Sequence, residues 1–393
     1  MTSGSARNYS STSGKATTGG AFDLKNNSSL IGFKGTEDLG NGLKGLFQFE
    51  TNVNAQGGTV AQNNGTLFGS ARDTYVGLNN KYGTVLGGYL STPFRSTLTS
   101  FDVMPGATGD GRIENMLGKV RMGGQSLGYN AASTGFIQAD ASIRATALAY
   151  ALPTMYGFNG SIAYTGSANN GSTNQTTQST TANAAGTALT SQTNVLGQGA
   201  LSMNLGWEGY GVAVKGAYQQ AKVNGTYSNS AGGATATTAE LNVQGYTSYL
   251  IGAAYTGVPG LKVSAVYNRN TVGTNQATST SSVLDGGAAK GSNNAVFVGA
   301  SYRFGNNEPR LSYQNVSNTS GLSSTGYTAQ DGASQWTANW GYYLSKRTQV
   351  YGLVSGIKNN ANGVYNMASG GTNLNATGGQ SVLTYGAGLR TNF

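Results

Sequence analysis

The chain has 393 residues and a formal charge of +9, and only 9% of its residues are charged, whereas soluble globular domains carry roughly 25%. It contains no histidine and no cysteine, which excludes Ser-His and Cys-His catalytic pairs, zinc sites built from these ligands, iron–sulfur clusters and disulfide frameworks. The 23 Lys and Arg residues are scattered along the chain, which argues against a nucleic-acid-binding patch. We therefore expect no enzyme, no cofactor and no bound metal.

Hydropathy excludes a transmembrane helix but not a spanning β-sheet. No run of 18 or more apolar residues occurs, and residues 1–28 lack the apolar core of a signal peptide. We expect 1–28 to be a polar N-terminal segment, either a loop or the remnant of a first strand. Residues 29–393 are expected to form a single β-barrel, whose strands need only alternate between apolar and polar side chains.

Such alternation recurs along the chain. From Leu201 to Trp207, from Val296 to Phe304 and from Trp336 to Tyr342, large apolar side chains alternate with small or polar ones. This period of two predicts strands with one apolar and one wet face. Aromatic residues near the predicted strand ends are expected to face lipid at the membrane interfaces; they include Tyr75, Tyr164, Trp207, Tyr249, Tyr255, Trp336, Trp340 and Tyr385.

The segments between the predicted strands are of two kinds, which alternate strictly. Short turns rich in Gly, Pro, Asn or Asp are predicted near 38–42, 79–83, 152–157, 207–211, 256–260, 305–309 and 344–347. Long polar loops are predicted near 54–68, 92–142, 166–196, 222–242, 270–293, 316–333 and 358–380. Seven turns and seven loops separate fifteen strands, and an outer-membrane barrel has an even number. The sixteenth strand should precede Ser28, where only Gly20–Leu24 is a candidate.

Particular stretches resemble the general porins of Gram-negative bacteria, most closely the beta-proteobacterial type. They are Ser29-Leu30-Ile31-Gly32-Phe33-Lys34-Gly35-Thr36-Glu37-Asp38-Leu39-Gly40, Arg72-Asp73-Thr74-Tyr75-Val76-Gly77-Leu78, and Tyr343-Leu344-Ser345-Lys346-Arg347-Thr348. The resemblance implies an all-β, 16-stranded antiparallel barrel in the outer membrane, assembled as a homotrimer in the lipid bilayer. It also implies a water-filled pore, narrowed by a third loop that folds inward.

The third loop corresponds to residues 92–142, and it is the long loop that carries many charges. Its basic residues Arg95, Arg112, Lys119 and Arg121 are balanced by Asp102, Asp110, Glu114 and Asp140. Under the resemblance this loop forms the constriction, where Asp102, Asp110, Arg112, Glu114, Lys119 and Arg121 are the candidate pore residues. The alternative is a solvated surface loop.

Alternation also assigns charged residues to the wet face of the strands. The candidate pore-wall residues are Lys34, Lys44, Glu50, Arg72, Lys215, Lys262, Arg303, Arg310 and Arg390. Eight of these nine are basic, so a narrow water column between them should favour anions. Several lie near predicted turns, where they could instead contact lipid headgroups or periplasmic water. Lys34 and Arg72 also match family positions that line the constriction.

Two departures from the family pattern suggest that the anion preference is modest. The family usually has arginine where this chain has Gly88 and Ala149, so the fixed field is expected to be weaker unless Arg112, Arg121 or Arg144 substitutes. The leading hypothesis is a general diffusion porin for small ions and hydrophilic solutes. The alternatives are a substrate-specific channel, or a barrel that anchors a structural or adhesive surface protein whose Ser-, Thr- and Asn-rich loops are the working part.

Overall fold

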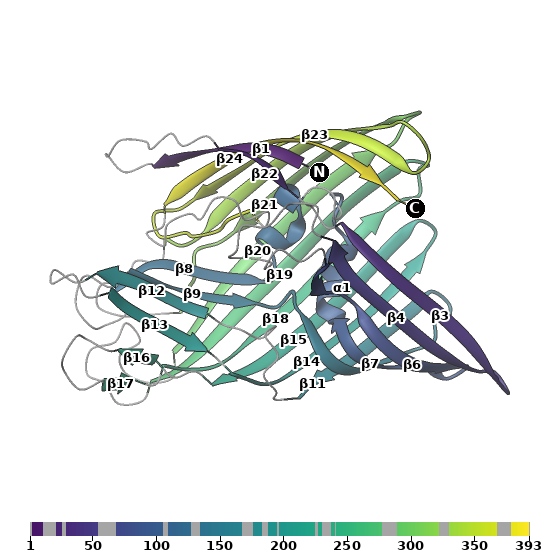
Figure 1. Cartoon of the computed structure of the whole chain (residues 1–393), viewed down its shortest axis with the longest axis horizontal. Coiled ribbons are helices and arrows are strands. Elements are labelled where there is room, and N and C mark those ends of the chain that lie inside the picture. The colour runs from purple at the N-terminus through teal and green to yellow at the C-terminus, as the bar shows by residue number, and fades with distance from the viewer. Residues whose placement is uncertain are drawn as a thin grey trace.

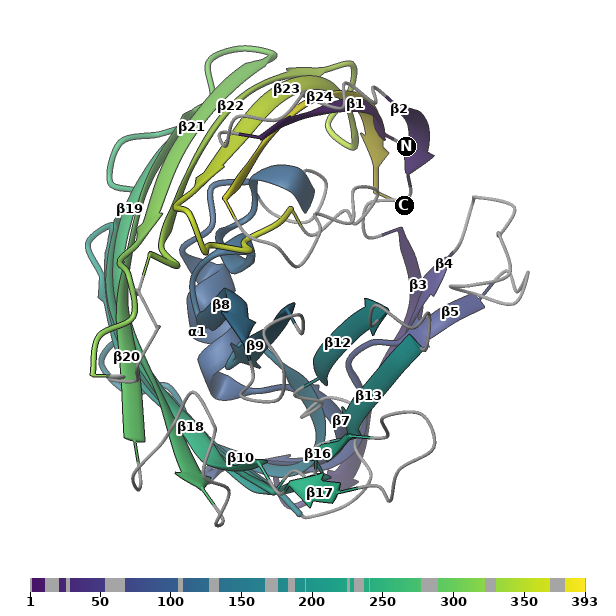
Figure 2. The ribbon, with the colours of Figure 1, turned by 90° about the vertical axis from the view of Figure 1, so that its left-hand side faces the viewer.

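Strands with alternating side chains pair antiparallel along the whole chain and roll into one barrel (Figure 1 and Figure 2). The protein is represented by a computed structural model, which describes residues 2–10, 21–25, 29–53, 68–104, 109–126, 134–166, 176–182, 188–194, 196–224, 227–229, 237–239, 241–276, 289–321, 330–367 and 379–392. Side chains are described for most of these residues; among the sequence candidates, the side chain of Arg121 lies outside them.

The wall strands are, in chain order, β1 (Thr2–Ser10), β3 (Leu30–Gly40), β4 (Leu43–Val53), β5 (Phe68–Ala71), β6 (Thr74–Asn80), β7 (Gly83–Ser91), β10 (Arg144–Ala151), β11 (Phe158–Thr165), β14 (Leu196–Gly209), β15 (Val212–Asn224), β18 (Leu241–Tyr255), β19 (Leu261–Gln276), β20 (Ala289–Tyr302), β21 (Asn307–Val316), β22 (Ala333–Tyr343), β23 (Thr348–Asn359) and β24 (Gln380–Thr391). Because β5 and β6 both pair with β4, they are two halves of one strand. The wall therefore has sixteen strands, and the fifteen predicted from residue 29 onward are all present.

The first strand differs from the prediction. The strand that pairs with β24 is β1, where Thr2 lies opposite Gly388 and Ser10 opposite Gln380. The predicted candidate near Gly20–Leu24 corresponds to the short strand β2 (Ala21–Lys25), which pairs with β1. Within the described ranges no backbone pairing joins β3 to β1 or β2. Residues 2–10 are mostly polar residues such as Thr, Ser and Asn, so the sequence shows no apolar alternation there that would predict a strand.

The ends of the barrel are unequal, as the spacing predicts. Tight turns lie at one end, whereas the short strands inserted between wall strands gather at the other (Figure 1). Two wall strands continue into the predicted loop 270–293, since β19 extends to Gln276 and β20 begins at Ala289. The inserted elements are α1 (Pro93–Ser100), the 3-10 turns η1 (Gly109–Gly111) and η2 (Ile113–Asn115), β8 (Lys119–Ser126), β9 (Thr134–Asp140), β12 (Thr176–Ala182), β13 (Ala188–Asn194), β16 (Tyr227–Asn229) and β17 (Thr237–Ala239).

The two faces of the wall have opposite character. On β20 the outward Val296 and Val298 are 42% and 52% exposed, whereas the inward Phe297 is fully buried. Outward residues elsewhere are equally apolar, among them Leu205, Leu311 and Trp340. In the part of the chain that the structure describes, no helix is long and apolar enough to cross a membrane.

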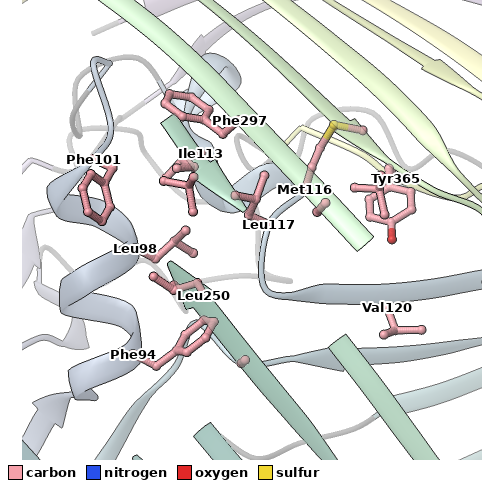
Figure 3. Close-up of a cluster of buried hydrophobic side chains, with 14 of the residues drawn as sticks. Phe94, Leu98, Phe101, Ile113, Met116, Leu117, Val120, Leu250, Phe297 and Tyr365 are labelled. Carbon is pink, nitrogen blue, oxygen red and sulfur yellow. The ribbon is translucent and has the colours of Figure 1, made fainter. Parts of the chain in front are cut away.

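The apolar core lies inside the barrel, between the third loop (residues 92–142) and the wall strands. Figure 2 shows α1, β8 and β9 within the ring of strands. The loop contributes Phe94, Leu98, Phe101, Ile113, Met116, Leu117 and Val120, which pack with Leu250 and Phe297 of the wall (Figure 3). The described part of the loop from Thr92 to Val120 is thus largely buried inside the barrel.

Because the outward face is apolar, a charge placed there should destabilise the folded protein in a bilayer. We expect Val298→Arg, near the middle of β20, to lower the free energy of unfolding from lipid vesicles by about 2–4 kcal/mol. Thr36→Arg on the inward face of β3 should change it little, because water reaches that face. Urea titration of both variants, followed by tryptophan fluorescence, measures the difference; equal losses would contradict the assignment of faces.

Candidate functional site

The third loop leaves the wall through a capped helix. Thr92 ends the segment after β7 and accepts a hydrogen bond from the Arg95 amide at 3.3 Å, and Pro93 occupies the first turn of α1, where its missing N–H is tolerated. The buried face of α1 lies against β14: the Phe94 amide donates to Ser202 Oγ at 3.0 Å, and Asn204 Nδ2 donates to Thr97 Oγ1 at 2.9 Å. The helix is therefore fixed along one side of the barrel interior.

Beyond α1 the loop follows the wall from β19 to β23, held by side-chain donors of the wall that bind its backbone carbonyls. Ser264 Oγ donates to the Phe101 carbonyl at 2.5 Å, and Lys262 Nζ donates to the Ser100 and Asp102 carbonyls at 3.0 and 2.7 Å. Three further bonds run from Gln314 to the Arg112 carbonyl (3.0 Å) and from Gln335 and Ser355 to the Asp110 carbonyl (2.5 and 3.2 Å).

Most charged side chains of the third loop interact within the loop. Glu114 pairs with Arg95 and accepts a hydrogen bond from Ser142 Oγ at 2.6 Å. Burial raises its pKa, but the Arg95 and Arg112 guanidinium groups outweigh burial, so the Glu114 pKa is lowered. Lys119 pairs with Asp140 at 3.4 Å, and the half-buried Arg112 lies 3.8 Å from Glu114. Of the other candidates, Asp110 is buried and the Arg121 side chain lies outside the described residues.

Asp102 is a buried carboxylate that fixes the loop's shape. Its Oδ1 accepts from the Met104 amide at 2.9 Å and its Oδ2 from the Ile113 amide at 3.1 Å, so it joins two separate turns of the loop. Burial raises the pKa of Asp102 to about 6, although both amides favour the charged form. The sequence predicts Asp102 as a pore residue, and the structure gives it a structural role as well, because it holds two turns of the loop together.

The wall that faces the third loop carries the candidates Lys34, Glu50 and Arg72. Arg72 Nε binds Glu50 Oε1 at 2.5 Å, and its Nη1 donates to Asn52 Oδ1 at 3.2 Å. Lys34 is exposed on the inward face of β3. A second pair beside them joins Arg144 to Asp73 at 3.0 Å; the sequence had suggested only Arg144, because the partner lies across the sheet.

Three more candidates contact oppositely charged or aromatic groups. Lys215 pairs with Glu208 at 2.5 Å. Arg310 is buried, pairs with Glu308 at 2.5 Å and donates to Asn339 Oδ1 at 2.7 Å. The guanidinium of Arg303 lies 3.8 Å from the centre of the Tyr343 ring.

The remaining candidates are exposed Lys44 and half-buried Arg390. Among the residues that the structure describes, no carboxylate lies within ion-pair distance of Lys34, Lys44 or Arg390. The formal positive charge of the inward face is therefore smaller than a count of its basic residues suggests.

Tyr75 corrects the sequence analysis, since it faces inward and not toward lipid. Its hydroxyl donates to Gln48 Oε1 at 3.2 Å, and it packs against the buried cluster of Leu90, Ala147 and Ala163. Neighbouring Val76 is 60% exposed on the outer face. The wall strand breaks at Arg72 and Asp73, between β5 and β6. This break shifts the alternation, so that Arg72 and Tyr75 face the same side in spite of their opposite parity.

The backbone at Gly88 accommodates glycine but not the arginine that is usual in the family at this position. Its φ of 153° and the close approach of the Thr74 carbonyl leave no space for a Cβ atom. An arginine could not occupy this position without a shift of the β6–β7 hairpin. Within the described ranges, no three acidic side chains gather as a metal-binding group.

The raised pKa of Asp102 predicts a pH dependence. The pKa of Asp102 is about 6 in the folded protein, above its value in the unfolded chain. Between these two values, the folded protein therefore binds a proton at Asp102 that the unfolded chain has released. The contribution of Asp102 to stability is therefore greatest below about pH 4 and declines as the pH rises to about 6. Unfolding free energies of the wild type should show this decline relative to Asp102→Asn, by up to about 3 kcal/mol; parallel pH profiles for the two proteins would contradict it.

Comparison with known proteins is consistent with this architecture. The family model described as Gram-negative porin matches residues 2–363. The major outer membrane protein P.IB of Neisseria gonorrhoeae is 33% identical over 144 residues, which cover 37% of this chain and 34% of that protein. P.IA of Neisseria meningitidis serogroup C is 39% identical over 74 residues, 19% of this chain and 18% of the relative. The chain thus matches about a third or less of the length of these curated relatives.

Solved structures match over the whole chain. An anion-selective porin from Comamonas acidovorans has a TM-score of 0.65 and 22% identity, and the match covers 100% of this chain and 97% of that one. Salmonella typhi OmpF, solved in complex with daunomycin, has a TM-score of 0.52 and 18% identity, with 98% and 95% coverage. At these identities the likeness establishes the fold, and the family model establishes the kinship: the chain belongs to the Gram-negative porin family of outer-membrane proteins, which is not a family of enzymes.

Proposed function

We propose that the protein forms a water-filled channel for the passive passage of small hydrophilic solutes and ions across the outer membrane. The observation that carries this proposal is the unequal burial of the inward face. Inward residues of β20–β23 are buried beneath the third loop, whereas the inward Arg72 and Glu50 on the opposite wall keep 20% and 19% of their side-chain surface exposed. Solvent thus reaches the interior along the wall that the third loop does not cover.

We further infer a weak preference for anions. The pairs Arg72–Glu50, Arg144–Asp73, Lys215–Glu208 and Arg310–Glu308 are each neutral. Five of the candidate wall cations then lack a carboxylate within ion-pair distance among the described residues: Lys34, Lys44 and Arg390, together with Lys262, which binds backbone carbonyls, and Arg303, which lies over the Tyr343 ring. This surplus of positive charge at a low-dielectric wall favours anions. The Comamonas acidovorans porin of similar fold is named anion-selective, which supports the same sign here.

Conductance in a planar bilayer tests the channel itself. Under a KCl gradient we expect large stepwise currents with a reversal potential of the sign for chloride preference. We propose a homotrimer, supported by the trimer form of the similar OmpT fold, so the steps should come in threes. A folded protein that carries no current would favour the anchoring barrel with functional loops, and saturation by one solute would favour the substrate-specific channel.

A matched pair of variants tests which charges set the selectivity. Lys34→Ala removes a cation that has no carboxylate partner, so the permeability ratio of chloride to potassium should fall. The double variant Glu50→Ala/Arg72→Ala removes a neutral pair and should leave that ratio nearly unchanged. Reversal potentials under identical gradients measure both ratios. A larger change in the double variant would show that the Arg72–Glu50 pair, and not Lys34, sets the selectivity.

A further inference from the structure

Beyond the anchors described above, the third loop has a further point of attachment at Gly118 and Lys119, where it turns from η2 into β8. Gly118 has a φ of 76°, in the left-handed region that favours glycine, and its amide donates to Asn268 Oδ1 at 2.8 Å. The Lys119 carbonyl accepts from Asn293 Nδ2 at 3.0 Å, and from Asn270 Nδ2 and the Tyr365 hydroxyl, both at 3.3 Å. Three donors thus converge on one carbonyl oxygen, which has two lone pairs.

The wall side of this attachment is a closed network of buried polar side chains, formed by Ser248, Asn268, Asn270 and Asn293. Asn270 Nδ2 donates to Asn268 Oδ1 and to Asn293 Oδ1, both at 2.9 Å, and Ser248 Oγ donates to Asn270 Oδ1 at 2.6 Å. None of the four side chains is more than 3% exposed. Because buried amides are costly when unpaired, this network holds its donors in one orientation toward the loop.

Tyr365 comes from a different part of the chain, in the segment 360–367 after β23. Two hydrogen bonds of 2.9 Å join the Asn359 carboxamide to the backbone N–H and carbonyl of Tyr365. The Asn360 amide donates to the Gly332 carbonyl at 2.8 Å, and the Asn362 amide to the Gln330 carbonyl at 2.7 Å. These contacts turn the segment back over the end of β22 instead of letting it extend away from the barrel.

The Tyr365 side chain enters the core between the third loop and the wall. It is 1% exposed and belongs to the apolar cluster that includes Met116, Val120 and Phe297 (Figure 3). Its hydroxyl also accepts from Asn293 Nδ2 at 3.2 Å, so it joins the polar network to the Lys119 carbonyl. Neighbouring Met367 is buried as well, with its sulfur 3.0 Å from Thr384 Oγ1 of β24.

We propose that segment 360–367 is a second inward-folded element that clamps the third loop to the wall, with Tyr365 as the positioning residue. The clamp acts at Lys119, beyond the anchors of α1, and so fixes the part of the loop that those anchors do not hold. Only the conductance readout of this proposal depends on the proposed channel function, since the attachment of the loop can be measured without any current.

The chain lacks cysteine, so one introduced thiol reports on the loop alone. Met116→Cys puts it at a fully buried position of the third loop, where a methanethiosulfonate reagent should react slowly in the folded protein. In this background Tyr365→Ala removes the ring and the hydroxyl. We expect labelling to become at least about tenfold faster, because loss of a buried aromatic ring strongly favours the detached loop. In bilayers, open-channel current noise should rise in parallel.

Three variants separate the clamp from general damage. Tyr365→Phe retains the ring and should restore slow labelling almost completely, because Asn270 and Asn293 still bind the Lys119 carbonyl. Tyr365→Leu keeps apolar volume and replaces the alanine variant if that one does not fold. Tyr156→Ala, at a 97% exposed position in the turn between β10 and β11, is the matched control and should label like the parent.

Folding of each variant is verified by far-UV circular dichroism before labelling. Equal labelling rates, within twofold, for folded Tyr365→Ala or Tyr365→Leu and for the parent would overturn the clamp. Fast labelling in the parent itself would overturn it too, since the loop would then be detached already. Absence of current from a parent that labels slowly would refute the channel and leave the clamp intact.

Discussion

The hydrogen bonds from inward side chains of the wall to backbone carbonyls of the third loop are the constraint on which the interior depends. Strand pairing satisfies the backbone of the wall, but a loop at membrane depth has no such ladder and must find its donors elsewhere. Ser264, Gln314 and Gln335 provide them, each from an inward position of a different strand. This requirement explains why the inward face of β19–β23 is rich in hydroxyls and amides although it is buried. It also lets Phe94, Leu98 and Phe101 of the loop form an apolar core with wall side chains such as Leu250 and Phe297, beside the polar groups that bind the loop backbone.

Most of the barrel could be predicted from the sequence, because alternation marks most strands and turn-forming residues mark the tight turns. Alternation over Val296–Phe304 identified both β20 and its outward face, and Gly, Pro and Asn marked the tight turns. Local signals failed where the phase was broken, as at Tyr75, and where a strand is polar, as in β1. The path of the third loop carries no such signal, since its anchors lie more than a hundred residues away in the chain; the bond from Ser264 to Phe101 spans 163 positions.

Charge is the property for which sequence reasoning and geometry differ most. Alternation gives the face of a basic residue but not its partner across the sheet. Alternation places Arg72 and Arg310 on the same inward face as Lys34, yet each of them pairs with a carboxylate. Since paired charges contribute little net field, the electrostatic character of the interior is set by a few residues. A count of basic positions would overestimate it, and the absence of arginine at Gly88, which sterics require, reduces it further.

The direction in which the third loop is anchored has a consequence for assembly. Nearly all of its wall contacts beyond α1 are made with strands that follow it in the chain, up to Ser355, which is 245 positions beyond Asp110. Contacts of such sequence separation form late, because the chain between them must be ordered first. By this argument, α1 can dock once β14 has paired, whereas we expect the part of the loop beyond α1 to dock later, after the strands β19–β23 that hold its carbonyls.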